Sequence, residues 1–312
     1  MRINYSIIIP HKNTPKLLER CLESIPDRDD IQVIIIDDHS DANKVDFKNF
    51  PGVGVDRIRI LFSEKSKGAG AARNRGLQEA EGKWLFFADA DDFFNPNFIE
   101  KADNYVFSEA DIVYFSVNSV YSDTLEPGFR DSVIVGMIHD AIRTNQFDQL
   151  RYKHLGPVSK MVRNEFVKMH NLKFDETFAN NDAMFSVKCG YYAKNILVDP
   201  AEIYCITCSR DSVSHKYSEV IARDRLVVYK NINQFLNSIH KSAYRVNLIP
   251  CLLCIRHWSI KSFFKRSFLL PFGYYLFFFW VDCFNIILYM IVLVMNSSKR
   301  RQFKARKNMI VK

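Results

Sequence analysis

The sequence predicts an α/β fold in which a mostly parallel sheet is flanked by helices, followed by a helical extension that associates with a membrane. Three observations support this prediction. Continuously apolar, strand-like segments alternate with helix-like segments over residues 1–117, which is typical of parallel strands buried on both faces. Acidic side chains directly follow two of these apolar segments. A long apolar segment with basic flanks lies near the C-terminal end.

The predicted elements follow one another in a regular order. Strands are expected at 6–9, 33–36, 57–62, 84–88 and 111–117, and helices at 15–24, 68–80 and 96–106. Pro15 and Pro96 suit the first position of their helices, and Thr14 is the expected N-cap of the helix that Pro15 begins. Further along, helices are expected at 182–192 and 218–239 and a strand at 203–207, whereas 123–151 permits no assignment.

The charge distribution argues against a nucleic-acid-binding protein. The 312 residues carry a formal net charge of +8, but residues 256–312 hold 11 of the 43 Lys and Arg residues and one of the 35 acids. The remainder, 1–255, has 32 basic and 34 acidic residues and is nearly neutral. Positive charge beside apolar sequence favours a membrane surface as partner over nucleic acid. The seven cysteines, an odd number, favour free thiols over a disulfide framework.

Carboxylates are predicted to converge at one edge of the sheet. Asp37 and Asp38 follow the strand at 33–36, and Asp89, Asp91 and Asp92 follow the strand at 84–88. The carboxyl ends of parallel strands share an edge, and open α/β sheets bind ligands there. Hard divalent cations suit such oxygen ligands and neutralise charge on a departing diphosphate. The alternative is a solvated acidic turn that caps the next helix.

Two other segments near this edge each have two interpretations. In the segment 37–40, one carboxylate of the pair Asp37 and Asp38 accepts a hydrogen bond from a base N–H or ribose hydroxyl, or the segment forms an Asx-type turn. The glycine-rich segment 68–76 is no dinucleotide-binding loop, because Arg73 stands where the third glycine would be. It predicts a helix N-terminus with close backbone approach that brings cationic side chains near a phosphate or base, or simple close packing of helix on sheet.

Asp182 and His215 are also open to two interpretations. Asp182 begins a predicted helix, where it acts either as an N-cap that complements the helix dipole or as a general base for an acceptor hydroxyl. His215 follows a polar loop and is either a surface histidine or a metal or phosphate ligand. The C-x-x-C pairs at 205–208 and 251–254 favour buried free cysteines over a shared zinc site.

Four segments carry a resemblance to a known family. They read "SIIIPHKN", "VIIIDDHSD", "KSKGAGAARNRGLQEAEGKWLFFADADDFF" and "FDETFANNDAMFSVKCGYYAKNILVD", and together they resemble the family 2 glycosyltransferases with the GT-A fold. The resemblance is strong over 4–106 and weaker to about 215. It implies a GT-A domain at 1–215 with a Rossmann-like nucleotide-sugar-binding half at 1–117 and an acceptor half at 118–215. A helical extension at 216–267 and an apolar segment with a basic tail at 268–312 would follow.

The resemblance implies that several residues bind the donor and a metal. Pro10 and Asp38 would line the base pocket, and Arg73 would lie near the donor. The acidic cluster would form a DxD-type site for the ribose and a divalent metal, Mn²⁺ or Mg²⁺. In this site Asp89 and Asp91 would face the donor and Asp91 and Asp92 the metal. His215 falls where many such folds supply a late metal or phosphate ligand.

The resemblance also implies roles on the acceptor side. Asp182 would be the catalytic base of an inverting displacement, and Lys160 lies in a segment that the family places near the acceptor. Two positions depart from the family pattern. His39 replaces the usual glycine after the Asp pair, and Asn181 replaces the usual Glu before the base.

These roles predict a metal-dependent, inverting glycosyltransferase. The donor would be a nucleotide-diphospho-sugar, with a UDP-sugar expected, and the acceptor a glycan or lipid-linked glycan in cell-surface polysaccharide biosynthesis. There are two alternatives. One is a nucleotidyl- or phosphoryl-transferring enzyme that uses the same metal site. The other is a catalytically inactive, membrane-docked scaffold of the same fold.

The apolar segment 268–295 predicts association with a membrane. About 20 apolar residues span a bilayer, but Pro271, Gly273, Asp282 and Asn285 interrupt this segment. Basic flanks on both sides tend to stay in the cytoplasm. We therefore expect a re-entrant hairpin or in-plane helices, with a single span or a buried core or oligomer helix as alternatives. This expectation places the protein on the cytoplasmic face of the cell membrane.

Overall fold

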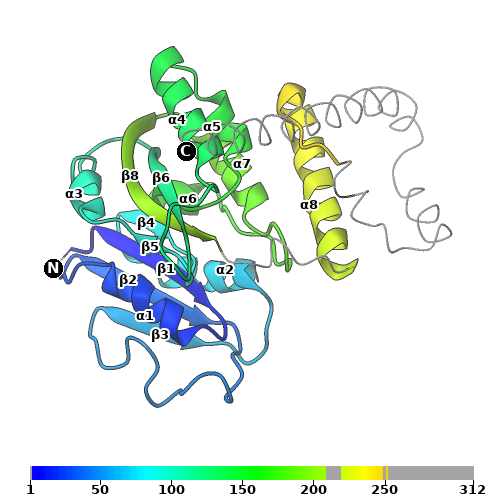
Figure 1. The fold of residues 1–312 in the computed structure, drawn as a ribbon. Coiled ribbons are helices and arrows are strands. Elements are labelled where there is room, and N and C mark those ends of the chain that lie inside the picture. Colours follow the sequence, from blue (N-terminus) through cyan, green and yellow to red (C-terminus); the bar gives the residue numbers. More distant parts are fainter. Residues whose placement is uncertain (1, 209–218, 249–250, 252–312) are drawn as a thin grey trace, which may run out of the picture. The chain divides into compact units, whose positions relative to one another are not determined.

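The computed structural model describes residues 2–208, 219–248 and 251. The chain divides into two compact units, Met1–Val246 and Asn247–Lys312. The first unit contains the sheet and the helices that Figure 1 labels. Within the described part no helix is long and apolar enough to cross a membrane. His215 and the predicted apolar segment and basic tail at 268–312 lie outside the described residues.

The strands of the first unit form one mixed, eight-stranded sheet with the order β3-β2-β1-β4-β7-β6-β8-β5. Their bounds are β1 Tyr5–His11, β2 Ile31–Asp37, β3 Ile58–Phe62, β4 Trp84–Phe87, β5 Phe93–Phe94, β6 Ile112–Tyr121, β7 Lys160–Arg163 and β8 Ile196–Cys208. The pairs β1–β2, β1–β4, β2–β3 and β6–β8 are parallel, whereas β7 and β5 run antiparallel to their neighbours. The predicted mostly parallel α/β sheet is therefore confirmed.

The helices confirm the predicted order and add three that were not predicted. Their bounds are α1 Pro15–Glu23, α2 Ala69–Glu79, α3 Phe98–Asp103, α4 Ser132–Thr144, α5 Asp148–Lys153, α6 Asn164–Met169, α7 Ala183–Tyr192 and α8 Glu219–Ser238. The unassigned stretch 123–151 contains α4 and most of α5. The sequence of α4, SVIVGMIHDAIRT, mixes β-branched residues with a glycine, so its local preference did not indicate a helix.

Two predicted helix starts require correction. Pro15 begins α1 as expected, but the Thr14 side chain makes no capping hydrogen bond, because its backbone angles (φ −130°, ψ 53°) lie outside the usual N-cap region. The third helix begins at Phe98 and not at Pro96, because Asn97 adopts a left-handed conformation (φ 66°) that interrupts the helix before it.

Alternate residues of the central strands face two separate hydrophobic cores. Ile7 and Ile9 of β1 join the core that includes residues of α1 and α3. Ile8 of β1 joins the core formed with α2 and with α4 to α7. This alternation explains the continuously apolar strand sequences, because a sheet with helices on both faces buries every side chain of its central strands.

Helix α8 supports the helix that begins after Asp182. Val228, Ile232 and Leu236 of α8 pack in one cluster with Ala183 and other side chains of α5 and α7. The helix predicted at 218–239 is therefore present, and it belongs to the same compact unit as the sheet. Its packing fixes α7 against the rest of the fold.

Candidate active site

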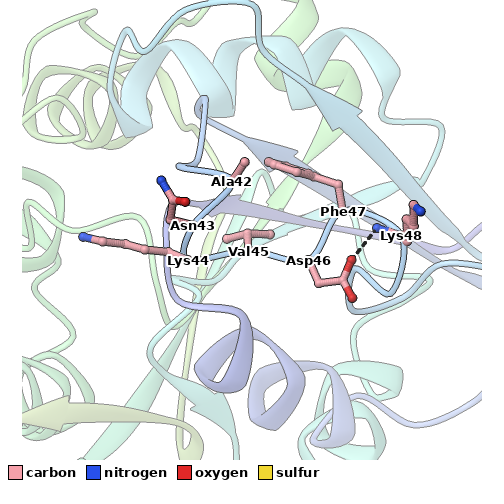
Figure 2. Close-up of a pocket in the computed structure, with 7 residues that line it drawn as sticks. All are labelled: Ala42, Asn43, Lys44, Val45, Asp46, Phe47 and Lys48. Carbon is pink, nitrogen blue, oxygen red and sulfur yellow. Dashed lines mark hydrogen bonds between the residues drawn. The ribbon is translucent and has the colours of Figure 1, made fainter.

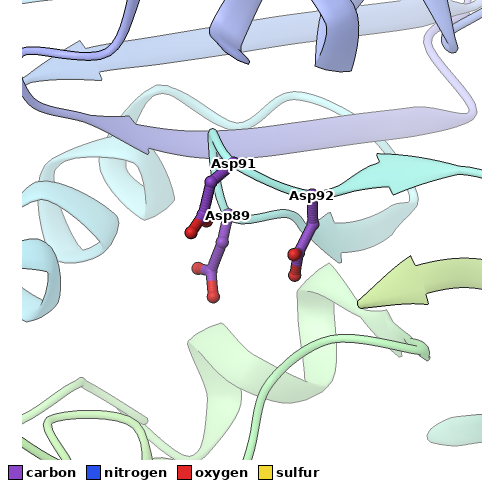
Figure 3. Close-up of side chains that lie close together, drawn as sticks. All are labelled: Asp89, Asp91 and Asp92. Carbon is purple, nitrogen blue, oxygen red and sulfur yellow. The ribbon is translucent and has the colours of Figure 1, made fainter. Parts of the chain in front are cut away.

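Three carboxylates gather in the turn between β4 and β5. Asp89, Asp91 and Asp92 each place one carboxylate oxygen within 4.8 Å of those of the other two. Figure 3 shows the three side chains directed toward the same side of the turn. The Asp92 N–H donates to the Asp89 carbonyl oxygen (3.0 Å), which closes the turn. The predicted acidic cluster at the carboxyl end of a central strand is therefore present.

Strand β8 holds this turn through two side chains that were not predicted as site residues. The Thr207 N–H and the Tyr204 hydroxyl donate to the two oxygens of Asp92 (2.7 and 3.1 Å). The Tyr204 oxygen accepts the Asp89 N–H (2.9 Å), and the Thr207 hydroxyl donates to the Asp91 carbonyl oxygen (2.8 Å). Strand β8 thus orients the Asp92 carboxylate and holds the backbone at Asp91.

The charges of the turn are only partly compensated by the protein. Burial raises the pKa of Asp91, and the neighbouring Asp89 adds to the shift. Burial followed by the charges of Asp91 and Asp89 raises the pKa of Asp92 well above its usual range. Among the described residues Arg73 pairs with Asp89 (2.5 Å), whereas no Lys or Arg forms an ion pair with Asp91 or Asp92. A hard divalent cation such as Mn²⁺ or Mg²⁺ fits this set of oxygen atoms and this excess of negative charge.

Arg73 connects the acidic turn to the segment that precedes Asp182. One guanidinium nitrogen donates to Asp89, and another donates to the Asn181 side-chain oxygen (2.8 Å). The guanidinium also lies over the Phe174 ring, 5.4 Å from its centroid. The Arg73 side chain is only 4% exposed, so its geometry is fixed by these contacts. Asn181, in place of the family's usual Glu, gives Arg73 a neutral partner on this side.

Asp182 is the N-cap residue of α7, but its side chain makes no capping hydrogen bond. Burial raises the pKa of the Asp182 carboxyl; the charge of Arg73 lowers it, and that of Asp89 raises it further. Because burial is the largest of these effects, the pKa of Asp182 is raised overall. Within the described residues no other side chain donates a hydrogen bond to this carboxylate, so it is available to accept a proton. Asp182 therefore occupies the predicted N-cap position without the side-chain hydrogen bond that N-cap residues usually make.

The acids after β2 serve as anchors for loops. Asp38 accepts hydrogen bonds from the Ser66 hydroxyl (2.6 Å) and from the N–H groups of Lys67 and Gly68 (2.8 and 3.1 Å). Asp38 therefore holds the chain that leads into α2. The local turn is closed by Asp37, which accepts the Ser40 N–H (2.8 Å). The contact of Asp38 with a nucleotide base stays a prediction.

Two backbone features shape the edge around these acids. Pro10 lies within β1 and has no N–H to donate. Its backbone nitrogen faces β4, but the pairing of β1 with β4 ends at Ile8↔Phe87. The missing N–H therefore costs no hydrogen bond of the sheet. His39 adopts a left-handed conformation (φ 59°). Glycine occupies this region without strain, which explains the glycine that the family usually carries here.

Gly70 provides the close backbone approach that the glycine-rich segment predicted. A Cβ at position 70 would lie 2.0 Å from the Asp175 carbonyl oxygen and 2.8 Å from the Asn181 Cβ. We expect Gly70→Ala to lower the free energy of unfolding by about 1–3 kcal/mol, as overpacking does, and to reduce activity by displacing the chain before Asp182. Thermal or denaturant unfolding measures the first effect, and turnover the second.

Gly136 offers a matched control for this substitution. It lies within α4, and a Cβ added there meets nothing within 4 Å. We expect Gly136→Ala to stabilise the protein by about 0.5–1 kcal/mol, since alanine is the better helix former. Equal stability of the two variants would contradict the close contact at Gly70.

A surface depression formed by described residues lies apart from these groups. It has a volume of about 520 Å³ and is lined by the consecutive residues 42–48 of the loop after β2 (Figure 2). A single segment lines it, and none of the predicted site residues takes part. The convergent polar groups that mark a ligand site are instead those of the acidic turn and Asp182.

A comparison with family models identifies the class of protein. The model described as glycosyl transferase family 2 matches residues 6–169, more than half of the chain. The chain belongs to this family. The match runs from β1 to the end of α6 and includes the acidic turn and Arg73. The chain is therefore a transferase of sugar residues by family, as its sequence segments indicated.

Curated relatives of the chain include other glycosyltransferases. The chain is 25% identical over 251 residues to the putative glycosyltransferase EpsH of Bacillus subtilis, covering 78% of this chain and 72% of that relative. It is 23% identical over 274 residues to the poly(ribitol-phosphate) beta-N-acetylglucosaminyltransferase TarS of Staphylococcus aureus. That match covers 83% of this chain but only 45% of TarS.

Solved structures share the fold. TarS residues 1–349 from S. aureus in complex with UDP-GlcNAc match with a TM-score of 0.60 and 21% identity, over 87% of this chain and 77% of that one. The mannosyltransferase PcManGT from Pyrobaculum calidifontis, in complex with GDP-Man and Mn²⁺, matches with a TM-score of 0.55 and 12% identity, over 91% and 84% of the two chains. The fold is GT-A-like, as predicted.

Proposed function

We propose that this glycosyltransferase is metal-dependent and inverting. It transfers a sugar from a nucleotide-diphospho-sugar, with UDP as the expected nucleotide, to a glycan or lipid-linked glycan in cell-surface polysaccharide synthesis. One observation carries the proposal: the acidic turn and Asp182 lie at one site, joined through the Arg73 bridge between Asp89 and Asn181. The UDP-GlcNAc bound by the structural relative TarS supports UDP, and the Mn²⁺ in the PcManGT complex supports a metal.

Each group at the site has a chemical task in this reaction. Asp91 and Asp92 would hold Mn²⁺ or Mg²⁺, and the bound ion would supply positive charge to stabilise the departing nucleotide diphosphate. Asp182 accepts the proton of the acceptor hydroxyl while that oxygen attacks the anomeric carbon from the face opposite the diphosphate. The bond to the diphosphate breaks as the new glycosidic bond forms, so the anomeric configuration inverts. Pro10 and Asp38 line the base pocket in this proposal.

The membrane surface is part of the same proposal. An acceptor carried on a lipid would be reached by an enzyme docked on the cytoplasmic face of the membrane. The basic flanks and apolar sequence of 268–312 favour such docking. Binding of the full chain to anionic vesicles, measured by co-sedimentation, tests this part separately from the chemistry.

The chemistry is tested with a donor panel. Purified full-length protein is incubated with Mn²⁺ and UDP-, GDP- and dTDP-sugars, with and without a membrane-lipid extract, and release of the nucleotide diphosphate is followed. We expect Mn²⁺-dependent release from one donor, stimulated by the extract. Chelation of the metal should abolish it.

The other outcomes separate the alternatives. Absence of both binding and release across the panel indicates the inactive scaffold. Metal-dependent cleavage that yields a nucleoside monophosphate and a sugar phosphate, instead of the nucleotide diphosphate, indicates a phosphoryl-transferring enzyme. Either result overturns the proposed function.

A further inference from the structure

Lys160 is a buried lysine whose ammonium group is directed into the protein. The residue is only 3% exposed and lies at the start of β7. Its Nζ donates to the carbonyl oxygens of His154 and Gly156 (2.7 and 2.6 Å) and lies 5.5 Å from the centroid of the Tyr114 ring. An ammonium buried and bound in this way is a poor candidate for direct contact with an acceptor. It is well suited to fix the turn at 154–156.

The same turn is attached to the helix that begins after Asp182. The Gly156 carbonyl oxygen accepts a second hydrogen bond, from the Ser186 hydroxyl (3.2 Å). Ser186 lies one helical turn after Asp182, and its N–H donates to the Asp182 carbonyl oxygen (3.0 Å). Lys160 and the first turn of α7 therefore share one hydrogen-bond acceptor, Gly156, so a shift of this carbonyl would be transmitted to Asp182.

The buried ammonium also belongs to the charges around Asp182. The charged groups that act on the Asp182 carboxylate are Arg73, Asp89 and Lys160. Arg73 and Lys160 lower the pKa of Asp182, and Asp89 raises it. Burial lowers the pKa of Lys160 to about 7, so the lysine carries its positive charge below that pH. Cys189, which also acts on Lys160, stays a neutral thiol because burial raises its pKa to about 12.

We propose that Lys160 is a positioning residue for Asp182. It fixes the 154–156 turn against the first turn of α7 and supplies a positive charge near the base, without touching the acceptor. This inference rests on the proposed function, because it assumes that Asp182 is the base. The family resemblance places Lys160 near the acceptor, and this inference gives it a structural and electrostatic role there.

The test compares Lys160→Met with Ser186→Ala in the full-length enzyme. Methionine keeps the length of the side chain but removes its charge and hydrogen bonds. We expect Lys160→Met to lower kcat by about 10- to 100-fold, as displaced catalytic groups do, with donor KM within about twofold of wild type. The acidic limb of its pH–rate profile should move to higher pH, because loss of the positive charge raises the pKa of Asp182.

Ser186→Ala separates position from charge and protects the test against misfolding of the lysine variant. We expect it to lower kcat by several-fold while leaving the acidic limb where it is in wild type, since no charge is removed. Lys153→Met is the matched control. Lys153 is half-buried and donates to a backbone carbonyl, that of Arg245 (2.9 Å), but it does not act on Asp182. Its pH–rate profile should equal that of wild type.

The outcomes distinguish this inference from the proposed function. A wild-type enzyme that turns over, with unchanged kcat in both Lys160→Met and Ser186→Ala, overturns the role of Lys160 alone. An effect of Lys160→Met that is confined to acceptor KM also overturns it and indicates that Lys160 contacts the acceptor directly. Absence of turnover in wild type and variants alike overturns the proposed function and the inference with it.

Discussion

Asp182→Asn is expected to remove turnover while leaving donor binding almost unchanged. The substitution keeps the shape of the side chain but removes its ability to accept a proton. General bases contribute about 10²- to 10⁴-fold to rate, so kcat should fall by a factor in that range. Calorimetric binding of the donor with Mn²⁺ should match wild type, because the acidic turn and Arg73 are untouched. Turnover and binding are measured on the same preparation.

Asp175→Asn is the matched control for this variant. Asp175 lies in the segment that leads to Asp182, and burial likewise raises the pKa of its carboxyl. Among the described residues, no hydrogen bond joins the Asp175 side chain to the acidic turn. Asp175→Asn should therefore keep turnover within a few-fold of wild type. If Asp182→Asn retained most of the wild-type kcat, Asp182 would not be the base.

The pH dependence of the wild-type rate is a second test of Asp182 as the general base. The base works only when ionised, and its pKa is raised by burial. The rate should therefore fall as pH decreases through a value above about 3.9, the pKa of an unperturbed aspartate. In Asp182→Asn the residual rate should lose this acidic limb.

Asp91→Asn is expected to abolish high-affinity binding of Mn²⁺. Its carboxylate is the member of the acidic turn that lacks both an ion pair and a side-chain hydrogen bond among the residues that the structure describes. Loss of an outer-shell partner costs about 10- to 100-fold in metal affinity, and loss of a direct ligand should cost more. Metal affinity is measured by calorimetry or by the Mn²⁺ paramagnetic resonance signal, independently of turnover.

Asp92→Asn provides the comparison that assigns the roles within the turn. Its two oxygens are bound by Thr207 and Tyr204, so its substitution should lower stability more and metal affinity less than Asp91→Asn. Asp140→Asn, an exposed change on α4, should leave both unchanged. Wild-type Mn²⁺ affinity in Asp91→Asn would contradict the proposed metal site.

The sequence predicted the parts of this protein that depend on local patterns. Apolar runs followed by acids identified β2 and β4 and the carboxylates at their ends, because burial on both faces and strand direction leave a clear signature. The resemblance added Asp182 and Arg73, which no local pattern distinguishes from an N-cap acid and a helix-surface arginine.

The parts that could not be predicted depend on contacts between distant segments. Tyr204 and Thr207 reach the acidic turn only because β8 pairs with the two-residue strand β5. A tyrosine and a threonine in a buried strand were the only signal of this role. Nothing in the sequence indicated that Asp38 holds the loop at 66–68, whose approach is set by the position of α2, and its contact with a base stays a prediction. Such contacts form only in the assembled fold, and no characteristic residue spacing in the sequence indicates them.

The anomeric configuration of the first product shows whether the enzyme transfers the sugar with inversion. Proton NMR of donor hydrolysis, with water as the acceptor, follows the configuration of the released sugar before it mutarotates and requires no knowledge of the natural acceptor. From an α-linked donor with Mn²⁺, we expect wild type to release the β-anomer first and Asp182→Asn to show only the background rate. Initial release of the α-anomer would contradict a direct displacement assisted by Asp182.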